Sequence, residues 1–205
     1  MFSRLRSIMG SGSALGYLLQ AVPVVCIAGV IYGIVRMAVI RKSSVKVSLP
    51  KEAARLLLVC YLTGLVSLVI LPANFWLHLF DGIFLGWWEE LSPVFRLGEV
   101  QLVPSIIRVL SGELILGSWV KTMLIGNVAM FLPLGFLLPF ATEKVSGKNI
   151  VWIAAAVPLA AELLQTGFGR SFDADDLICN FLGIVVGFLI ALLTRSAAQK
   201  RKASN

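Results

Sequence analysis

Five apolar runs constrain the fold more than any other feature of this sequence. They cover about residues 17–40, 53–71, 122–140, 150–167 and 176–194. An α-helix needs roughly 20 apolar residues to cross the hydrocarbon core of a bilayer. The chain is 58% hydrophobic and only 14% charged, whereas charged residues make up about a quarter of a typical globular domain. The sequence therefore predicts an all-α fold, a polytopic membrane helix bundle with about five transmembrane helices.

The region 73–120 is apolar but broken by charged residues and proline, so neither half of it is a good span. It holds four of the five tryptophans of the chain, and tryptophan prefers the membrane–water interface. We expect interfacial or re-entrant segments here, between the second and third helices. The chain then divides into four parts: N-terminal helices in 1–72, an outward interfacial segment in 73–120, a core of three helices in 121–195 and a basic cytoplasmic tail in 196–205.

The net charge of +7 reflects membrane topology better than nucleic-acid binding, because the basic residues stand at the ends of apolar runs. The sequence has no basic-aromatic patch and no zinc-ligand spacing, so we expect no nucleic-acid partner. The three cysteines lie in three different apolar runs and predict no disulfide framework. One histidine, His78, argues against a multi-histidine metal site and a serine–histidine triad.

Five spans put the 41–55 segment, the 141–149 turn and the C-terminus on one side of the membrane. That side, with Arg36 at a helix end, carries twelve basic and two acidic residues, and the other side carries six basic and nine acidic residues. The positive-inside rule places the first side in the cytoplasm. The N-terminus then lies outside despite Arg4 and Arg6, and the alternative is a first helix that does not fully span. The outward side holds the segment 73–120 and the turn 170–176.

Polar residues gather inside apolar surroundings at one place only, between Glu162 and Asn180. At helical spacing the fourth span has one stripe and the fifth span another. A charge in the bilayer core is costly, so such groups usually face the bundle interior or water. Small residues on each stripe would let the fourth and fifth helices approach closely, and Asn127 on the third helix is the natural third wall. The stripes are Ala155, Pro158, Glu162, Gln165 and Gly169, and Asp176, Asn180, Gly183 and Gly187.

Two interpretations of this cluster stay open. Clustered carboxylates suit hard cations, which makes Asp173, Asp175 and Asp176 candidate ligands of Mg²⁺ or Ca²⁺, while Arg170 suits a phosphate or carboxylate. The alternative is structural: Arg170 pairs with an aspartate, and Asp173 or Asp175 caps the fifth helix. The candidates for binding a ligand or a headgroup are Asn127, Glu162, Gln165, Arg170, Asp173, Asp176 and Asn180. No catalytic residue is assigned.

Two stretches resemble the VanZ-like family: GNVAMFLPLGFLLP at 126–139 and AELLQTGFGRSFDADDLICNFLGIVVG at 161–187. The resemblance covers about residues 96–193. It implies a small bacterial membrane protein of a family named for a member linked to low-level resistance to the glycopeptide teicoplanin. The motif positions come without an established role; they are Asn127, Pro133, Glu162, Gln165, Arg170, Asp173, Asp176 and Asn180.

Three functions follow as hypotheses. The first is a protein of the bacterial cytoplasmic membrane and cell envelope that contributes to glycopeptide resistance. It would bind drug, a lipid headgroup or a wall-synthesis partner at an outward-facing acidic and arginine site. The alternative is a membrane enzyme that acts on a phosphorylated or lipid-linked envelope substrate with a carboxylate-bound divalent cation. A transporter with Glu162 as a proton-titrating group is the weakest, because the spans are few and no internal repeat is visible. Pairing of two chains stays open.

Overall fold

The computed structural model describes residues 2–43, 47–90, 95, 97–115 and 117–204. Among these residues, five helices are long and apolar enough to cross a membrane: Leu15–Ser43, Leu49–Val69, Val120–Ala141, Gly147–Gly167 and Ala174–Arg201. They confirm the predicted all-α bundle with five candidate spans. The α-helices are α1 (Phe2–Met9), α2 (Ala14–Ser43), α3 (Leu49–Val69), α4 (Phe75–Leu85), α5 (Ser105–Leu110), α6 (Ser118–Ala141), α7 (Gly147–Gly167) and α8 (Ala174–Ser204).

Local signals explain why three long helices begin earlier than their apolar runs. Pro50 lies in the first turn of α3, where its missing N–H costs no hydrogen bond. The Ser146 hydroxyl accepts a hydrogen bond from the Asn149 N–H at the start of α7. At the start of α8, the Asp173 carboxylate accepts one from the Asp175 N–H at 2.8 Å. Such side-chain acceptors satisfy backbone donors that the first helical turn leaves unpaired.

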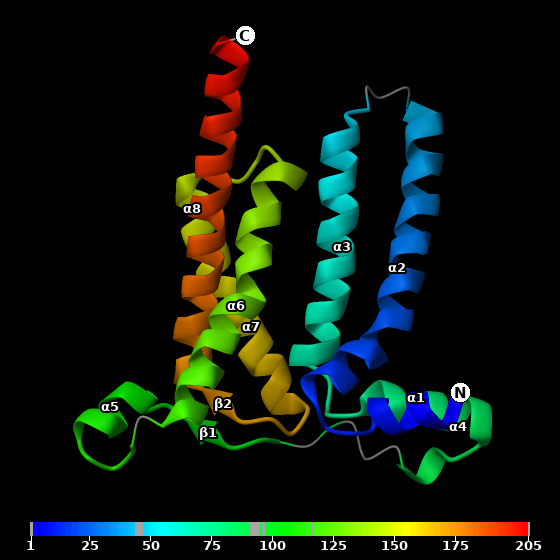
Figure 1. Cartoon of the computed structure of the whole chain (residues 1–205), viewed down its shortest axis with the longest axis vertical. Coiled ribbons are helices and arrows are strands. Elements are labelled where there is room, and N and C mark those ends of the chain that lie inside the picture. Colours follow the sequence, from blue (N-terminus) through cyan, green and yellow to red (C-terminus); the bar gives the residue numbers. More distant parts are fainter. Residues whose placement is uncertain (1, 44–46, 91–94, 96, 116, 205) are drawn as a thin grey trace.

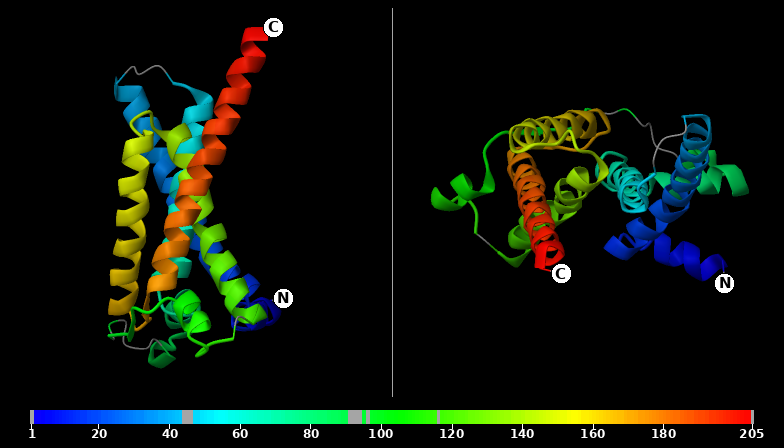
Figure 2. Two further views of the ribbon diagram at one scale, coloured as in Figure 1. Left: turned by 90° about the vertical axis from the view of Figure 1, so that its left-hand side faces the viewer. Right: turned by 90° about the horizontal axis from the view of Figure 1, so that it is seen from above.

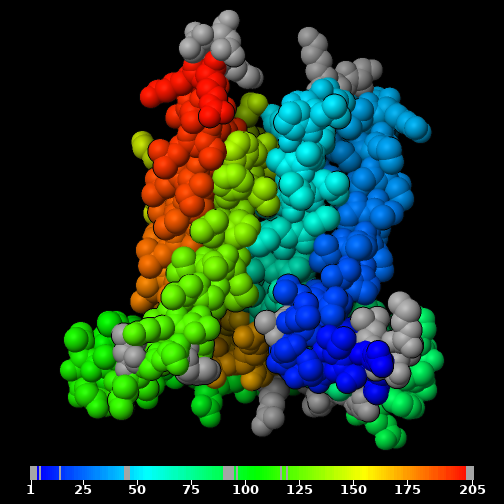
Figure 3. All heavy atoms as spheres, in the orientation of Figure 1, coloured from blue at the N-terminus to red at the C-terminus, as the bar shows by residue number. Residues whose placement is uncertain are grey.

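The long helices stand side by side, and the short elements gather at one end of them (Figures 1 and 2). The C-terminal ends of α2 and α8, the start of α3 and the α6–α7 connection lie at the opposite end. The division agrees with the two sides that the five-span topology predicts. Neither α4, with 11 residues, nor α5, with 6, has the roughly 20 residues that a span needs. In the space-filling view these segments extend to either side of the bundle at its base (Figure 3).

Helices α6 and α8 pack with their backbones in close contact. A Cβ atom placed on Gly187 would lie 2.0 Å from the carbonyl oxygen of Leu132, and one on Gly183 would lie 2.4 Å from that of Val128. From the other side, a Cβ on Gly135 would lie 1.9 Å from the Ile184 oxygen. From the sequence, we expect the small face of the fifth span to meet the fourth span. That expectation was wrong, because the glycines of α8 meet α6, where Gly135 supplies a matching small residue.

The hydrophobic core joins these helices to α3. Its fully buried members include Phe131 on α6, Ala154 on α7 and Ile184 on α8, and Leu65 on α3 packs in the same cluster. The Tyr61 hydroxyl of α3 donates a hydrogen bond to the backbone carbonyl of Met130 on α6. The core therefore fixes α3, α6, α7 and α8 relative to one another, and their shared end carries the polar cluster.

At that end α1 is held against α4 by an ion pair. The Arg6 guanidinium donates from Nε and Nη2 to both oxygens of Asp81, at 3.0 and 2.8 Å, and it stacks 5.0 Å from the ring centre of Trp87. Asp81 is only 4% exposed. A buried carboxylate needs such a partner, so Arg6 serves the packing of the short helices.

Candidate functional site

The turn between α7 and α8 organises the site. Helix α7 ends at Gly167, and Gly169 follows with a φ of +83°, a left-handed conformation that suits glycine. The chain then forms β2 (Phe172–Asp173), which pairs in parallel with β1 (Val100–Gln101). A Cβ on Gly98 would lie 1.8 Å from the Arg170 carbonyl oxygen. The segment before β1 is therefore pressed against the turn and fixes its position.

Three side chains of the predicted cluster are buried between the helices. Glu162 is 0% exposed, and Gln165 and Asn180 are each 3% exposed. Glu162 Oε2 accepts a hydrogen bond from the backbone N–H of Asp173 at 3.0 Å, and Gln165 Nε2 donates to the carbonyl of Val69 at the end of α3 at 2.7 Å. The first bond ties the α7–α8 turn to α7, and the second ties α7 to the end of α3.

The predicted stripe on the fourth span is partly wrong in phase. Pro158, Glu162 and Gln165 are buried as expected, but Ala155 is exposed and its neighbour Ala154 takes the buried position. Gly169 lies beyond the helix, in the turn. On α8 all four members of the stripe lie on the packed side: Asn180, Gly183 and Gly187 are buried, and Asp176 is half-buried.

Each of the three aspartates binds a different partner. Asp173 caps α8 through the Asp175 N–H, which is one of the structural roles that the sequence suggested. Asp175 accepts from the backbone N–H of Ser105 with both oxygens, at 3.0 and 2.8 Å, and so holds the start of α5. Asp176 accepts a hydrogen bond from the Asn127 amide. The structure thus places Asn127 as the third wall of the cluster.

Burial raises the pKa of the Asp173 carboxyl above its ordinary value. The negative charge of Asp175 adds to this effect, whereas the hydrogen bond from the Asp175 N–H and the charge of Arg108 lower the pKa. The capping hydrogen bond therefore favours the ionised form of Asp173, whereas the burial of the carboxyl disfavours its charge.

Arg170 does not pair with an aspartate. Its Nη1 donates to the carbonyl oxygens of Leu68 and Val69, at 3.1 and 2.8 Å, and within the described part of the chain it has no carboxylate at ion-pair distance. These carbonyls end α3, where no intrahelical donor remains and where the helix dipole favours a cation. The structural alternative of an arginine–aspartate pair is therefore not found, and Arg170 instead caps a neighbouring helix.

Predicted site residues line two separate cavities at this end of the bundle. The first, here called the acidic cavity, measures about 310 Å³, and its walls include Asn127, Asp173, Asp175, Asp176 and Arg108. The second, here called the Arg170 cavity, measures about 640 Å³ and lies between α2, α3, α6 and the turn at Arg170. The predicted site residues thus share one end of the bundle, but Arg170 and the aspartates line different cavities. Glu162, Gln165 and Asn180 line neither of these two cavities.

Three buried acceptor oxygens have no hydrogen-bond partner among the described residues: Glu162 Oε1, Gln165 Oε1 and Asn180 Oδ1. Buried polar atoms are nearly always satisfied, so each requires a donor. A proton on the Glu162 carboxyl, an ordered water or a ligand N–H supplies one. The polar groups between α7 and α8 are therefore short of donors rather than of acceptors.

The metal hypothesis for Asp173, Asp175 and Asp176 stays a prediction. In the described ranges no three acidic, histidine or cysteine side chains form a group that could hold a metal ion. All three aspartates nevertheless line the acidic cavity, and carboxylate oxygens are the ligands that Mg²⁺ and Ca²⁺ prefer.

Sequence reasoning missed three residues of these cavities. Arg108 lines the acidic cavity together with the aspartates, and its charge inside an otherwise apolar segment was the available signal. Tyr17 and Trp76 line the Arg170 cavity. They lie far from Arg170 in sequence, so only the packing of α2 and α4 against the turn brings them there.

The fold and this end cluster define a class: a five-span helical membrane protein whose α7–α8 turn carries buried and cavity-lining polar groups. Comparison with protein families matches residues 58–195 to VanZ/LLP1, and the chain belongs to this family. The match begins within α3 and so extends well beyond the 96–193 that the resemblance suggested. No curated protein and no solved structure gives a significant match.

Proposed function

We propose that this chain acts in the bacterial cell envelope and lowers susceptibility to teicoplanin-type glycopeptides without catalysis. It binds drug, a lipid headgroup or a wall-synthesis partner at the end of the bundle that carries the α7–α8 turn. Membership of the VanZ/LLP1 family supports this proposal, since that family is named for a member linked to teicoplanin resistance.

The observation that carries the proposal is the acidic cavity. Three aspartates and Asn127 contribute to one cavity at the polar end of the bundle. Ionisable groups that are partly buried in a membrane bundle are usually paired or functional, and the hydrogen bonds of Asp173, Asp175 and Asp176 leave acceptor capacity unused. A cationic or hydrogen-bond-donating group of a drug or headgroup fits such walls.

The charge distribution along the bundle supports an outward orientation for this cavity. The opposite end carries the 41–55 segment, the 141–149 turn and the C-terminal end of α8, which together hold most of the basic residues. Under the positive-inside rule that end faces the cytoplasm. The acidic cavity then faces the side from which a glycopeptide arrives.

Expression in a susceptible bacterial host tests the proposal. The wild-type chain should raise the minimum inhibitory concentration of teicoplanin, and Asp176→Asn combined with Asp173→Asn should abolish the rise because it removes two charges from the acidic cavity. Glu143→Gln is the matched control, since Glu143 pairs with Lys51 at the opposite end. An unchanged inhibitory concentration with the wild-type chain confirmed in the membrane would refute the proposal.

One observation favours the enzyme alternative. Arg108 lines the same cavity as the three aspartates, so a divalent cation on the carboxylates and a phosphate on the guanidinium fit side by side. Purified protein should then bind Mg²⁺ or Mn²⁺, and the Asp173→Asn, Asp176→Asn double variant should not. Equal metal binding by the two proteins would exclude this alternative.

A further inference from the structure

The Arg170 cavity has a chemical character opposite to that of the acidic cavity. Of the described residues that line it, Arg170 is the charged one, and no carboxylate contributes to its wall. Its volume of about 640 Å³ falls within the range of small-molecule sites, about 300–1,000 Å³. The cavity therefore favours an anion.

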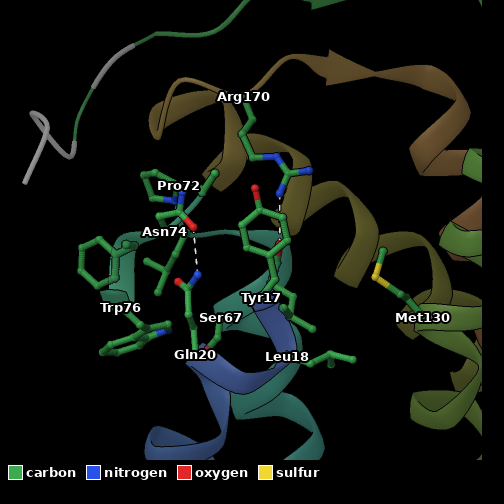
Figure 4. Close-up of a pocket in the computed structure, with 13 residues that line it drawn as sticks. Tyr17, Leu18, Gln20, Ser67, Pro72, Asn74, Trp76, Met130 and Arg170 are labelled. Atoms are coloured by element: carbon green, nitrogen blue, oxygen red, sulfur yellow. Dashed lines mark hydrogen bonds between the residues drawn. The ribbon is translucent and has the colours of Figure 1, made fainter. Parts of the chain in front are cut away.

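Hydrogen-bond donors point to the same kind of ligand. Both hydrogen bonds of Arg170 use Nη1, so the N–H groups on Nε and Nη2 have no acceptor among the described residues. Trp76 also lines the cavity, but its indole Nε1 is buried from solvent, so a ligand in the cavity does not reach it. Tyr17 adds a hydroxyl, and Figure 4 shows its ring below the Arg170 guanidinium. A headgroup rich in acceptor oxygens would satisfy these donors.

The remaining wall is mostly apolar. It includes Leu18 on α2, Leu71 and Pro72 after α3, and Met130 on α6. Leu18 and Met130 are exposed at the surface of the bundle, and Figure 4 shows them on the same side of the cavity. An apolar chain that enters between α2 and α6 would bury its surface against these side chains.

The polar side chains that α2 and α3 contribute to the cavity, Gln20 and Ser67, are already held in place by hydrogen bonds. Gln20 Nε2 donates to Met9 O at 2.7 Å and to Asn74 Oδ1 at 2.8 Å, and the Ser67 hydroxyl donates to Thr63 O at 2.8 Å. The donors left for a ligand are therefore those of Arg170 and the Tyr17 hydroxyl, and they fix where a headgroup binds.

We propose that the Arg170 cavity binds an anionic amphiphile, with a phosphate-bearing headgroup on Arg170 and Tyr17 and an apolar chain along Leu18 and Met130. This inference rests on the proposed function, which includes binding of a lipid headgroup at this end of the bundle. It specifies that the lipid is anionic and carries a phosphate. A bilayer phospholipid and a phosphorylated lipid carrier share this chemistry, and the experiment distinguishes between them.

Native mass spectrometry of the full chain in a nonionic detergent measures the binding. The probes are phosphatidylglycerol, a polyprenyl phosphate, diacylglycerol without phosphate, and inorganic phosphate. Either phosphorylated lipid should bind at least about tenfold more tightly than diacylglycerol, because a charge-assisted hydrogen bond accounts for that much. Tighter binding of phosphatidylglycerol assigns the site to the bilayer, and tighter binding of polyprenyl phosphate assigns it to a lipid carrier. Equal binding of diacylglycerol, or equally tight binding of inorganic phosphate alone, overturns the proposal.

Two pairs of variants locate the site. Arg170→Gln should weaken lipid binding about tenfold, and Arg170→Lys should restore most of the affinity. Arg195→Gln is the control and should leave lipid binding unchanged. It removes a guanidinium that is bonded to the Pro139 carbonyl at the other end of the bundle. Met130→Trp fills the Arg170 cavity, and Met123→Trp alters the acidic cavity from the same helix. Their exposures are similar, 37% and 41%, so lipid binding should fall only in the first.

Each variant is checked for an unchanged unfolding temperature, and wild-type affinity in both Arg170→Gln and Met130→Trp overturns the site. A chain that raises the teicoplanin inhibitory concentration without binding these lipids refutes this inference alone. A chain that binds them without raising it refutes the proposed function and leaves the lipid site standing.

Discussion

Substitution of Gly187 by alanine tests the close packing of α6 and α8 most directly. The added Cβ would lie 2.0 Å from the Leu132 carbonyl oxygen, which is 1.4 Å short of an ordinary contact at 3.4 Å. Both groups belong to helical backbone, so neither can rotate away, and the helices must separate. Overpacking of this kind costs about 1–3 kcal/mol, and we expect the upper value because the contact is between two backbones.

The gain in helix propensity opposes this cost. Alanine stabilises a helix by roughly 0.5–1 kcal/mol relative to glycine, so Gly187→Ala should lose about 2 kcal/mol net. For a chain of this size that corresponds to a fall of roughly 4–8 °C in the unfolding temperature. Gly126→Ala on α6 is the control, since a Cβ there meets nothing within 4 Å, and it should unfold slightly above the wild type.

The assay is thermal unfolding of purified protein in detergent, followed by light scattering and by tryptophan fluorescence. Equal unfolding temperatures for Gly187→Ala and Gly126→Ala would refute the packing described here. Asn127 and Asp176 bond across the same two helices, so separation of α6 from α8 should also disturb the acidic cavity. Gly183→Ala, nearer to that bond, should weaken any binding there along with stability.

Three further predictions use the same unfolding assay or simple proteolysis. Glu162→Ala should lower the free energy of unfolding by about 2–4 kcal/mol, because it empties a fully buried site and leaves the Asp173 N–H unpaired. Glu162→Gln keeps an acceptor and should stay within about 1 kcal/mol of wild type. Equal losses of stability in the two variants would contradict this reasoning. The raised pKa of Asp173 means that its contribution to stability is full below the unfolded value of about 3.9 and is lost as pH rises through the higher folded value. Asp173→Asn keeps a capping side chain, so the stability difference between wild type and variant should change across that window, and a constant difference would exclude the effect. Arg6→Gln should release α1 from buried Asp81 and speed protease cleavage in the 10–13 loop, and an unaltered cleavage rate would show that α1 is held in another way.

Much of the fold could be predicted because the length of an apolar run is nearly sufficient to identify a membrane span. The five runs, the end at which each connection lies and the capping role of Asp173 all follow from local signals. The family follows as well, because the Glu162 to Gly187 stretch is contiguous in the chain.

The rest depended on which helices are neighbours. Glycines on one face of α8 fit any small-faced helix, and only the three-dimensional packing selects α6 with Gly135 over α7. The buried position at Ala154 rather than Ala155 is a phase error of one residue, about 100° around a helix with 3.6 residues per turn. The carbonyls that Arg170 binds could not be predicted, because they end α3, about a hundred residues earlier.

Helix α8 is longer than a membrane requires. Its 31 residues extend about 46 Å, whereas the hydrocarbon core is about 30 Å thick, and its C-terminal turns project beyond the other helices in Figure 2. The basic residues after Thr194 are thus carried on rigid helix, not on a loose tail, and Arg195 is fastened to α6 through the Pro139 carbonyl. A helix that exceeds the hydrocarbon core by about 16 Å carries Lys200 and Arg201 beyond the length that a span requires. Because a charge is costly in hydrocarbon, these residues oppose any movement of α8 into the bilayer.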